Sequence, residues 1–525
     1  MHKDPNRLNV ILIFLATFIT FCILNTFSCN KQAHANTKSK GLGIMEALTS
    51  ALKYSPDILL KDQDIRFSQG ALQQSQGSFD PTLQMGTSYT DQNTPITSDL
   101  AQEVKTASYN FQINKQLRNG VALNSSADVS QVETEYSSQY PTESPQNNAG
   151  VYFTLAIPLL KGRGVEATAA GELAAKVNLE ITELQSRDTI SQTVLNTALG
   201  YWAYRAAFEQ LKQYKQAEKR AEESLRITQA MITADQAPSS LLENTKAKLS
   251  SKKSSRILGG QILYEAQQTL GILMGIDFHS IETLPFPSDA LPGGTHEKIE
   301  KLYQQKQRLI ALALNRRYDF QALKKYIDYN NILLKQARNN LLPQFDLNLN
   351  TGYSGWDSGS GVGNTFSSLF KNVPGASAGI SFDLLLPISN NTAKGTLLQY
   401  RANLRKYQIQ VNQAARTISS NVATQLFALK QRLRQLSEAE DSVTYYAKSV
   451  KNAQKKFQLG MATLSDLLLI KDDLDLSISR KINIQQQYAN ALANLRYHTS
   501  TLIDFIGEGG RIGVEDLISV PDISE

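Results

Sequence analysis

The hexapeptide Gly162-Arg163-Gly164-Val165-Glu166-Ala167 has residue types and spacing that could bind a phosphate group. It follows an apolar segment and begins a helical pattern, as the glycine loop of a dinucleotide-binding site does. However, Pro158 interrupts the apolar segment, no parallel βαβ unit follows, and the helical pattern continues for roughly 65 residues, which is too long for that fold. We therefore interpret the two glycines as the passage from a strand to a helix.

Other residues that could do chemistry are few and scattered. His279, His296 and His498 lie far apart, and no G-x-S-x-G, H-E-x-x-H or Walker-type loop occurs. The two cysteines, Cys22 and Cys29, are too few for a zinc cage. The sequence thus predicts no enzymatic activity, no catalytic residue, no cofactor and no metal site.

The composition is that of an ordinary soluble-looking chain. The 525 residues include 54 basic and 48 acidic ones, a net charge of +6, and 41% are hydrophobic. This charge is dilute and no basic cluster with interleaved aromatic residues occurs, so nucleic acid is not an expected partner. The length alone would suggest three or four domains.

The amino terminus has the pattern of an export signal. Lys3 and Arg7 precede an apolar run from Leu8 to Phe27, and Ala33-His34-Ala35 provides the small-x-small pattern of a cleavage site. We therefore interpret residues 1–35 as a signal peptide. Cleavage after Ala35 would remove both cysteines.

Two alternatives to cleavage remain open. The apolar run is long for a signal and could be a membrane anchor, although no basic stop-transfer cluster follows it. Lipidation at Cys29 is the other alternative, although the bulky Phe27 stands where a lipidation motif has a small residue.

The chain contains an internal duplication. Residues 51–57 resemble residues 313–319 at an offset of 262, which also places Pro81 on Pro343. Further along, the offset falls to 229, because the first copy carries extra residues between its two prolines, and later still it is 225. The chain therefore consists of two copies of one unit.

We divide the chain accordingly into five parts. They are the signal peptide 1–35, a first repeat 36–276, a linker 277–297, a second repeat 298–505 and a C-terminal tail 506–525. Prolines and a glycine pair interrupt regular structure in the linker.

Each repeat is predicted to begin with a helix, at 44–78 and 298–340, and to contain a very long helix, at 164–232 and 391–457. At 1.5 Å per residue each long helix would extend about 100 Å. A further helix follows, at 239–274 and 463–505. From Leu464 onward, alternating steps of three and four residues follow a mostly apolar seam, which favours coiled-coil packing.

Between these helices, the segments 82–157 and 344–386 alternate with period two. One face would be apolar and the other hydrophilic, as in a sandwich or a membrane barrel. An exported chain with small polar residues on the second face favours the barrel. Short turns on one rim and long polar loops on the other agree with that interpretation.

The first copy carries an extra strand pair, near 107–117 and 120–132, joined at the hairpin signal Asn119-Gly120. A chain with six strands has too few for a closed pore, and an open sheet cannot leave unpaired edges in lipid. Closure must therefore come from several chains.

With its repeats in this order, the chain resembles the TolC-like outer-membrane efflux protein family. The resemblance covers about 44–505 and is carried by several short segments. They are Met45-Glu46-Ala47-Leu48, Ser55-Pro56-Asp57, Phe79-Asp80-Pro81, Pro158-Leu159-Leu160, Leu341-Leu342-Pro343-Gln344, Phe457-Gln458-Leu459-Gly460 and Leu464-Ser465-Asp466-Leu467-Leu468.

The family resemblance implies a mainly α fold with a membrane β-barrel, in which a homotrimer builds the barrel and continues it as a coiled-coil helical tunnel. It implies an outer-membrane location extending into the periplasm, in contact with lipid. It also implies docking to a periplasmic adaptor protein and an inner-membrane RND, ABC or MFS transporter. The expected function is passive conduction through the exit duct of an efflux or type I secretion system. The alternative is an exported coiled-coil scaffold or adhesin, and the cargo is not predicted.

The resemblance places the turns near 233–240 and 458–465 at the periplasmic tip, where relatives close like an iris. The expected gate and docking residues are Asp235, Ala237, Pro238, Gly460, Ala462, Thr463 and Asp466. Gly460 stands where a left-handed conformation is useful. Three copies of Asp466 would form a ring that attracts cations, or Asp466 is an ordinary acid at a helix N-terminus.

The sequence departs from the family at two places. Ala462, Leu469 and Leu241 replace charged residues that some relatives carry at the tip, so a salt-bridged lock there is in doubt. The extra strand pair would give eighteen strands per trimer in place of the usual twelve, which is a hypothesis that a structure with 107–132 outside the wall would refute.

Overall fold

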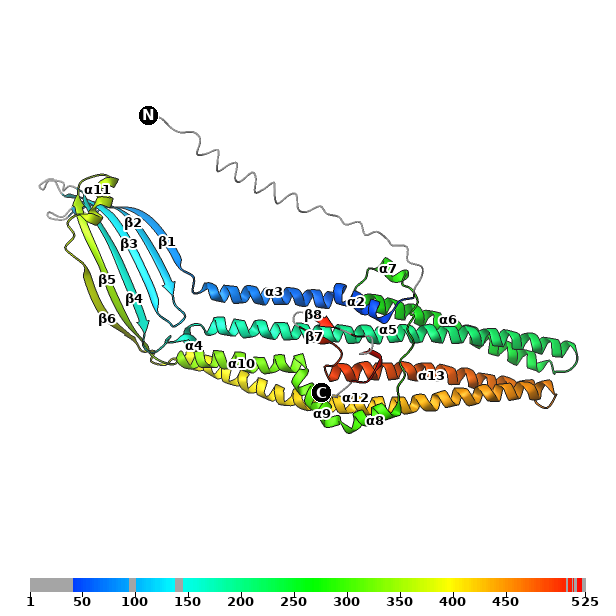
Figure 1. Ribbon diagram of the computed structural model, residues 1–525. Helices are drawn as coiled ribbons and strands as arrows, with labels where there is room; N and C mark the ends of the chain where they lie inside the picture. The colour runs from blue at the N-terminus through cyan, green and yellow to red at the C-terminus, as the bar shows by residue number, and fades with distance from the viewer. Residues whose placement is uncertain are drawn as a thin grey trace, which may run out of the picture. The chain divides into compact units, whose positions relative to one another are not determined.

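The computed structural model describes residues 41–93, 101–136, 145–506, 509–511, 513 and 517–521. The predicted signal peptide, its cleavage site and Cys29 lie outside these residues and remain predictions. From Leu42 onward the chain forms one unit, in which a six-stranded sheet joins a bundle of long helices (Figure 1). None of the described helices is long and apolar enough to cross a membrane.

The elements of the first repeat and the linker follow in chain order. They are α2 (Ile44–Tyr54), α3 (Pro56–Gly77), β1 (Thr82–Asn93), β2 (Ala101–Gln116), β3 (Ala122–Tyr136), β4 (Gln146–Pro158), α4 (Val165–Thr168), α5 (Ala170–Thr233), α6 (Ser240–Leu273) and α7 (Phe278–Glu282).

The second repeat and the tail follow the same plan. Their elements are α8 (His296–Gln304), α9 (Lys306–Arg316), α10 (Tyr318–Asn339), β5 (Gln344–Ser358), α11 (Val362–Ser367), the 3₁₀ turn η1 (Ser368–Phe370), β6 (Ser377–Leu385), α12 (Asn391–Gln458), α13 (Leu464–His498), β7 (Asp504–Ile506) and β8 (Gly509–Arg511).

Corresponding helices keep the spacing seen in the sequence. The bounds of α9 and α10 each lie 262 residues after those of α2 and α3. The last residues of α12 and α13 lie 225 residues after the last residues of α5 and α6. α5 and α6 form one antiparallel helical hairpin, and α12 and α13 form the other.

Several helices predicted as continuous are interrupted. Ser55 has an extended ψ of 125° because it precedes Pro56, whose ring disfavours a helical residue before it. Arg317 has ψ 123° at the equivalent point, where its guanidinium binds Asp319. The last helix ends at His498 and not at 505, since Ser500 turns the chain with φ 55°.

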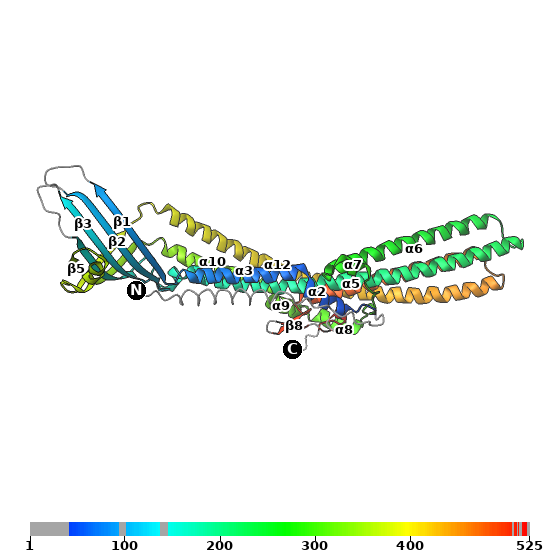
Figure 2. The same ribbon diagram turned by 90° about the horizontal axis from the view of Figure 1, so that it is seen from above.

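The strands form a single antiparallel sheet in the order β1-β2-β3-β4-β5-β6 (Figure 1). The sheet lies at one end of the long helices in the view from above as well (Figure 2). The extra pair of the first copy, β2 and β3, therefore lies inside the sheet between β1 and β4. Along β4 and β5 the two repeats meet, with Leu155 opposite Leu349. The predicted six strands are confirmed, and 107–132 is part of the sheet.

Two large apolar clusters lie among the helices, one for each repeat. Trp202 and Tyr201 of α5 are fully buried in the first, together with Leu48 and Leu270. The second, around Leu426 of α12, is the corresponding cluster of the second repeat.

Part of the predicted C-terminal tail packs against the first cluster. Leu517 is buried in the first cluster, and Arg496 donates hydrogen bonds to the carbonyl oxygens of Ser519 and Thr501, at 2.7 and 3.0 Å.

Candidate functional site

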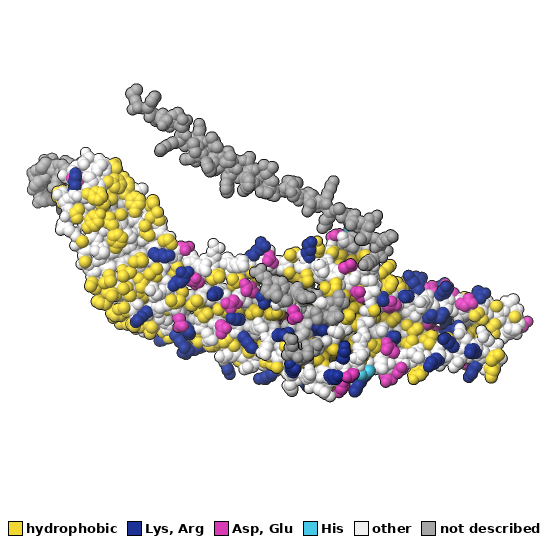
Figure 3. Space-filling model, in the orientation of Figure 1, with side chains coloured by type: hydrophobic (Ala, Val, Ile, Leu, Met, Phe, Trp, Pro, Cys, Tyr) yellow, Lys and Arg dark blue, Asp and Glu magenta, His cyan; other side chains and the backbone are white. Residues whose placement is uncertain are grey.

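The sheet has two faces of opposite character. In each strand, alternate residues share a face, and the register aligns Leu83 with Ile113 and, one row along, Leu123 with Leu155. The residues on this face are large and apolar, and they cover the side of the sheet seen in Figure 3. They include Leu83, Met85, Phe111, Ile113, Leu123, Val151, Phe153, Leu155, Leu347, Leu349, Ile380, Phe382 and Leu384.

The opposite face carries amides, hydroxyls and glycines. In one row, Gln84, Gln112 and Ser126 lie side by side across β1, β2 and β3. In another, Asn114, Asn124 and Asn350 do so across the sheet. An exposed apolar face backed by a wet polar face is the pattern of a membrane barrel wall and not of a sandwich core.

Both outer strands of the sheet are unpaired on one side within this chain. Every residue of β1 and of β6 is exposed. Each strand pairs only with its inner neighbour, β2 or β5. Long, exposed and partly apolar edges of this kind bind another strand, because their N–H and C=O groups need partners.

The hairpin between β2 and β3 packs against the start of the helices. Gly120 has φ 100°, and a Cβ there would come within 2.1 Å of the carbonyl oxygen of Gly162. Gly162 and Gly164 have φ values of 82° and 90° between β4 and α4. These glycines therefore form the strand-to-helix passage, as interpreted from the sequence, and they lie against a turn of the sheet.

The two helix turns at the far end of the hairpins have matching geometry. Asp235 after α5 has φ 57°, and Gly460 after α12 has φ 71°. In each turn the following amide bonds back to the helix: the N–H of Gln236 to the carbonyl of Met231, and that of Met461 to the carbonyl of Lys456, both at 2.8 Å. The left-handed residue thus ends each helix and reverses the chain.

Beyond these turns, α6 and α13 begin differently. Ala237 and Pro238 precede α6, whose preceding residue Ser239 makes no side-chain cap hydrogen bond. Ala462 precedes Thr463, the cap residue of α13. At the position equivalent to Asp466 the first repeat has Leu241, and the acid in the first turn of α6 is Glu243.

Asp466 forms a capping box with Thr463. Its carboxylate accepts hydrogen bonds from the Thr463 hydroxyl and backbone N–H, at 2.7 and 3.1 Å, and its own N–H donates to the Thr463 hydroxyl at 3.2 Å. The hydrogen bonds from Thr463 lower the pKa of Asp466. The helix-terminal role is thus present in the structure, and the side chain remains exposed.

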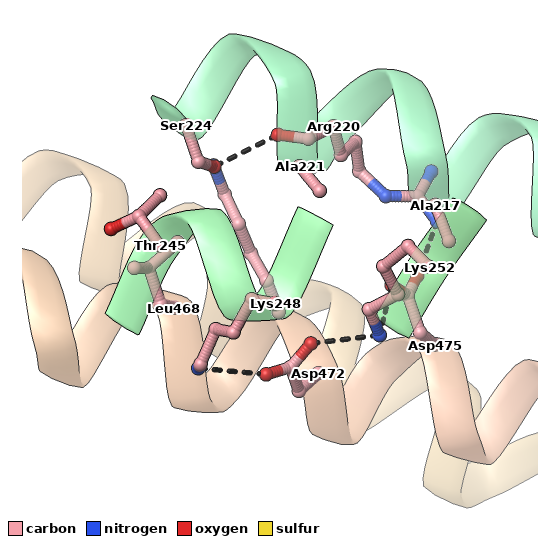
Figure 4. Close-up of a pocket in the computed structure, with 11 residues that line it drawn as sticks. Ala217, Arg220, Ala221, Ser224, Thr245, Lys248, Lys252, Leu468, Asp472 and Asp475 are labelled. Carbon is pink, nitrogen blue, oxygen red and sulfur yellow. Dashed lines mark hydrogen bonds and ion pairs between the residues drawn. The ribbon is translucent and has the colours of Figure 1, made fainter. Parts of the chain in front are cut away.

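A buried polar network joins the two hairpins a few turns from this end (Figure 4). Asp475 of α13 is 8% exposed and accepts from Gln213 of α5 at 3.1 Å. It also pairs with Arg220 of α5 and with Lys252 of α6, the latter at 3.4 Å. One carboxylate therefore connects three helices.

Asp472 extends the network by one turn. It pairs with Lys248 at 2.9 Å and with Lys252 at 2.8 Å. Burial raises the pKa of Asp472, but the hydrogen bonds from Lys252 and Lys248 outweigh burial and lower it. Nearby, burial and the positive charge of Arg220 lower the pKa of Lys471.

Sequence reasoning missed this network. Lys471 stood out as a polar member of the apolar seam, but that pattern could not show that partners come from α5 and α6, more than two hundred residues earlier. Asp475 follows the seam residue Leu474 and is not itself a seam position, so the seam spacing did not single it out, although it is buried.

A second buried charged group lies midway along the bundle. Arg317 pairs with Asp319 at 2.7 Å and contacts Nδ1 of His498 at 3.0 Å. Burial, aided by the charge of Asp319, raises the pKa of Asp188 to about 6. Burial also lowers the pKa of His498 to about 4. Within the described ranges, no three His, Cys, Asp or Glu side chains gather into a possible metal site.

These features define a class of protein: a wall of antiparallel strands with one apolar and one wet face, carried on two long helical hairpins. Residues 309–499 match the family described as outer membrane efflux protein. This domain covers most of the second repeat, and the family resemblance inferred from the sequence is confirmed.

Solved structures share the fold over most of the chain. The outer membrane protein VceC from Vibrio cholerae is 14% identical, with a TM-score of 0.63, covering 87% of this chain and 95% of its own. The Campylobacter jejuni CmeC outer membrane channel is 16% identical, with a TM-score of 0.61 and 90% of each chain covered. The Neisseria gonorrhoeae MtrE outer membrane channel is 14% identical, with a TM-score of 0.57, covering 90% and 94%. The predicted fold class is confirmed. The search of curated proteins found no match to the chain.

Proposed function

We propose that this protein is the outer-membrane exit duct of a tripartite efflux or type I secretion system, through which substrates pass passively to the exterior. The observation that carries the proposal is the two-faced sheet with both edges exposed, attached to two long helical hairpins. An exported scaffold or adhesin would need the helices but not an apolar outer face.

Three copies would close the barrel. β1 and β6 run in opposite directions, so β6 of one copy can pair with β1 of the next in an antiparallel ladder. A homotrimer of six-stranded sheets gives an even, fully antiparallel barrel of eighteen strands, which removes every edge from lipid. The polar face would then line a water-filled lumen.

The helical hairpins would extend the duct as a tunnel into the periplasm. Their far turns, with Asp235, Ala237, Pro238, Gly460 and Ala462, form the end away from the sheet. We propose this end as the gate and as the docking surface for a periplasmic adaptor, which connects the duct to an inner-membrane RND, ABC or MFS transporter. The energy for transport would come from that transporter.

The duct proposal is tested by assembly and conductance. Protein extracted from outer membranes with detergent should migrate as a heat-modifiable trimer and should open water-filled channels in planar bilayers. A soluble periplasmic monomer without channel activity would refute it.

Asp466 is proposed to act in the pore as well as in its capping box. Three exposed carboxylates near the threefold axis would attract cations. Asp466→Asn removes the charge while keeping an oxygen that can accept from Thr463. We expect the cation preference of single channels to fall. Unchanged selectivity would assign Asp466 to the helix end alone.

A further inference from the structure

The short helix α11 and the turn η1 lie against the apolar face of the sheet. The Phe366 ring faces the Tyr109 ring, with 6.2 Å between centroids. Tyr109 shares its face with Phe111, two positions along β2, and with Met85, which lies opposite Phe111 on β1. The segment between β5 and β6 is therefore folded back over the outside of the wall.

The residues of the sheet beneath α11 and η1 pack closely against them. Val129 and Ala149 are 4% and 2% exposed, although most of their face is open. A Cβ on Gly355, in the same row, would come within 2.3 Å of the Ser368 carbonyl oxygen. Small residues at Ala149 and Gly355 therefore leave the space that η1 fills.

Buried hydrogen bonds fasten the segment. Thr365 donates to Oδ1 of Asn147 at 2.8 Å, and both side chains are buried. Asp357 of β5 accepts from Ser367 at 3.0 Å and pairs with Lys371 at 2.6 Å. Satisfied polar groups under a short helix fix its orientation on the sheet.

The exposed surface of this segment is largely apolar. Val362 is 68% exposed and Phe370 80%, and Phe366 is still 46% exposed although its ring contacts Tyr109. Exposed aromatic and aliphatic side chains this close together, on a segment held in place from below, need a partner.

The position of the segment along the strands indicates its partner. In the row next to Val129 on the side of the helices, the face carries Phe111, Val151 and Tyr353. Outward, it becomes charged within two or three rows, where Lys105 pairs with Glu103 at 2.9 Å. The α11 segment thus covers the boundary between the apolar band and the charged rim, where aromatic girdles of membrane barrels lie.

We propose that α11 and η1 form an interfacial anchor that inserts Val362, Phe366 and Phe370 among the lipids of the outer leaflet. The apolar surface of the segment is continuous with the lipid-facing band of the sheet, and its depth matches the interface where an amphipathic element buries its apolar side. This inference rests on the proposed membrane barrel and adds a lipid contact outside its wall.

The test measures fluorescence quenching by brominated phosphatidylcholine in reconstituted vesicles. The chain has two tryptophans: Trp202 is fully buried in the helices, and Trp356 is replaced by phenylalanine to lower the background. In this Trp356→Phe background, Phe370→Trp reports on the anchor. Phe153→Trp reports on the middle of the apolar band, and Tyr445→Trp reports on an exposed position of α12.

We expect Phe370→Trp to be quenched, more strongly by bromine near the headgroups than by bromine deep in the acyl chains. Phe153→Trp should be quenched by both lipids, and Tyr445→Trp by neither. If Phe153→Trp is quenched but Phe370→Trp is not, the anchor is wrong while the barrel stands. If Phe153→Trp is not quenched, the barrel itself is refuted.

Discussion

Asp475→Asn should loosen the contact between the two helical hairpins. In the wild type, Asp475 accepts from Gln213, Arg220 and Lys252 and so connects α13 to α5 and α6. The asparagine keeps the shape and one acceptor oxygen but removes the charge. Asp472 would then be the one carboxylate of the described network left among four cations: Arg220, Lys248, Lys252 and Lys471.

The magnitude follows from burial. Breaking a fully buried ion pair costs about 3 to 5 kcal/mol. The Asp475 side chain is 10% exposed, but Arg220 and Lys252 are 35% and 22% exposed, so water can solvate them once the partner is lost. We therefore expect a loss of about 2 kcal/mol from the contact. If the hairpins separate when the duct opens, about 2 kcal/mol raises the open population about thirtyfold.

Single-channel recording in planar bilayers measures this directly. The Asp475→Asn channel should spend more time in its high-conductance state than the wild type. Asp473→Asn is the matched control, because it is the same change two residues away at an exposed position. If both variants behave as the wild type does, the network does not hold the hairpins together.

Three further outcomes are expected. Native Asp188 binds a proton below about pH 6, whereas in the unfolded chain it does so only below 3.8. Its contribution to stability is therefore lost as pH rises through 6, and Asp188→Asn should raise the denaturation temperature at pH 8 more than at pH 4. Both Gly460 and Asp235 have positive φ, so Gly460→Ala should destabilise its turn by about 1 kcal/mol and Asp235→Gly should stabilise the other turn. Hydrogen exchange at each turn, compared with the wild type, measures both effects, and exchange rates unchanged from the wild type would contradict this. Arg496→Met removes the donor to the carbonyl oxygens of Thr501, Ser519 and Val520 and should cost about 3 kcal/mol. Limited proteolysis should then cut first near residues 517–521, and a C-terminal segment that stays resistant would show that Arg496 does not hold it in place.

Much of the fold could be predicted because its signals are periodic. The alternation in residues 107–132 predicted that β2 and β3 are strands, and the offset of 262 placed α9 and α10 opposite α2 and α3. Helix breaks were harder. A proline marks the break at Ser55, but no proline marks the one at Arg317, whose side chain binds the nearby Asp319 and the distant His498.

The site could be predicted only where it is local. The left-handed turn at Gly460 and the helix-terminal position of Asp466 were expected from the local sequence, and the structure gives them the geometry of a turn and a helix start. α11 was not predicted, because six residues in a Gly- and Ser-rich loop carry no helical period and are fixed by the sheet beneath them. Asp475 was missed for the same reason, since its partners belong to the other repeat.

The central claim is that three chains close one barrel from six strands each. Electron cryomicroscopy of the detergent-extracted assembly, at a resolution that traces individual strands, tests it most directly. We predict a threefold particle with eighteen strands, in which β1 of one copy pairs with β6 of the next. A monomeric particle, or a barrel wall that excludes β2 and β3, would contradict it.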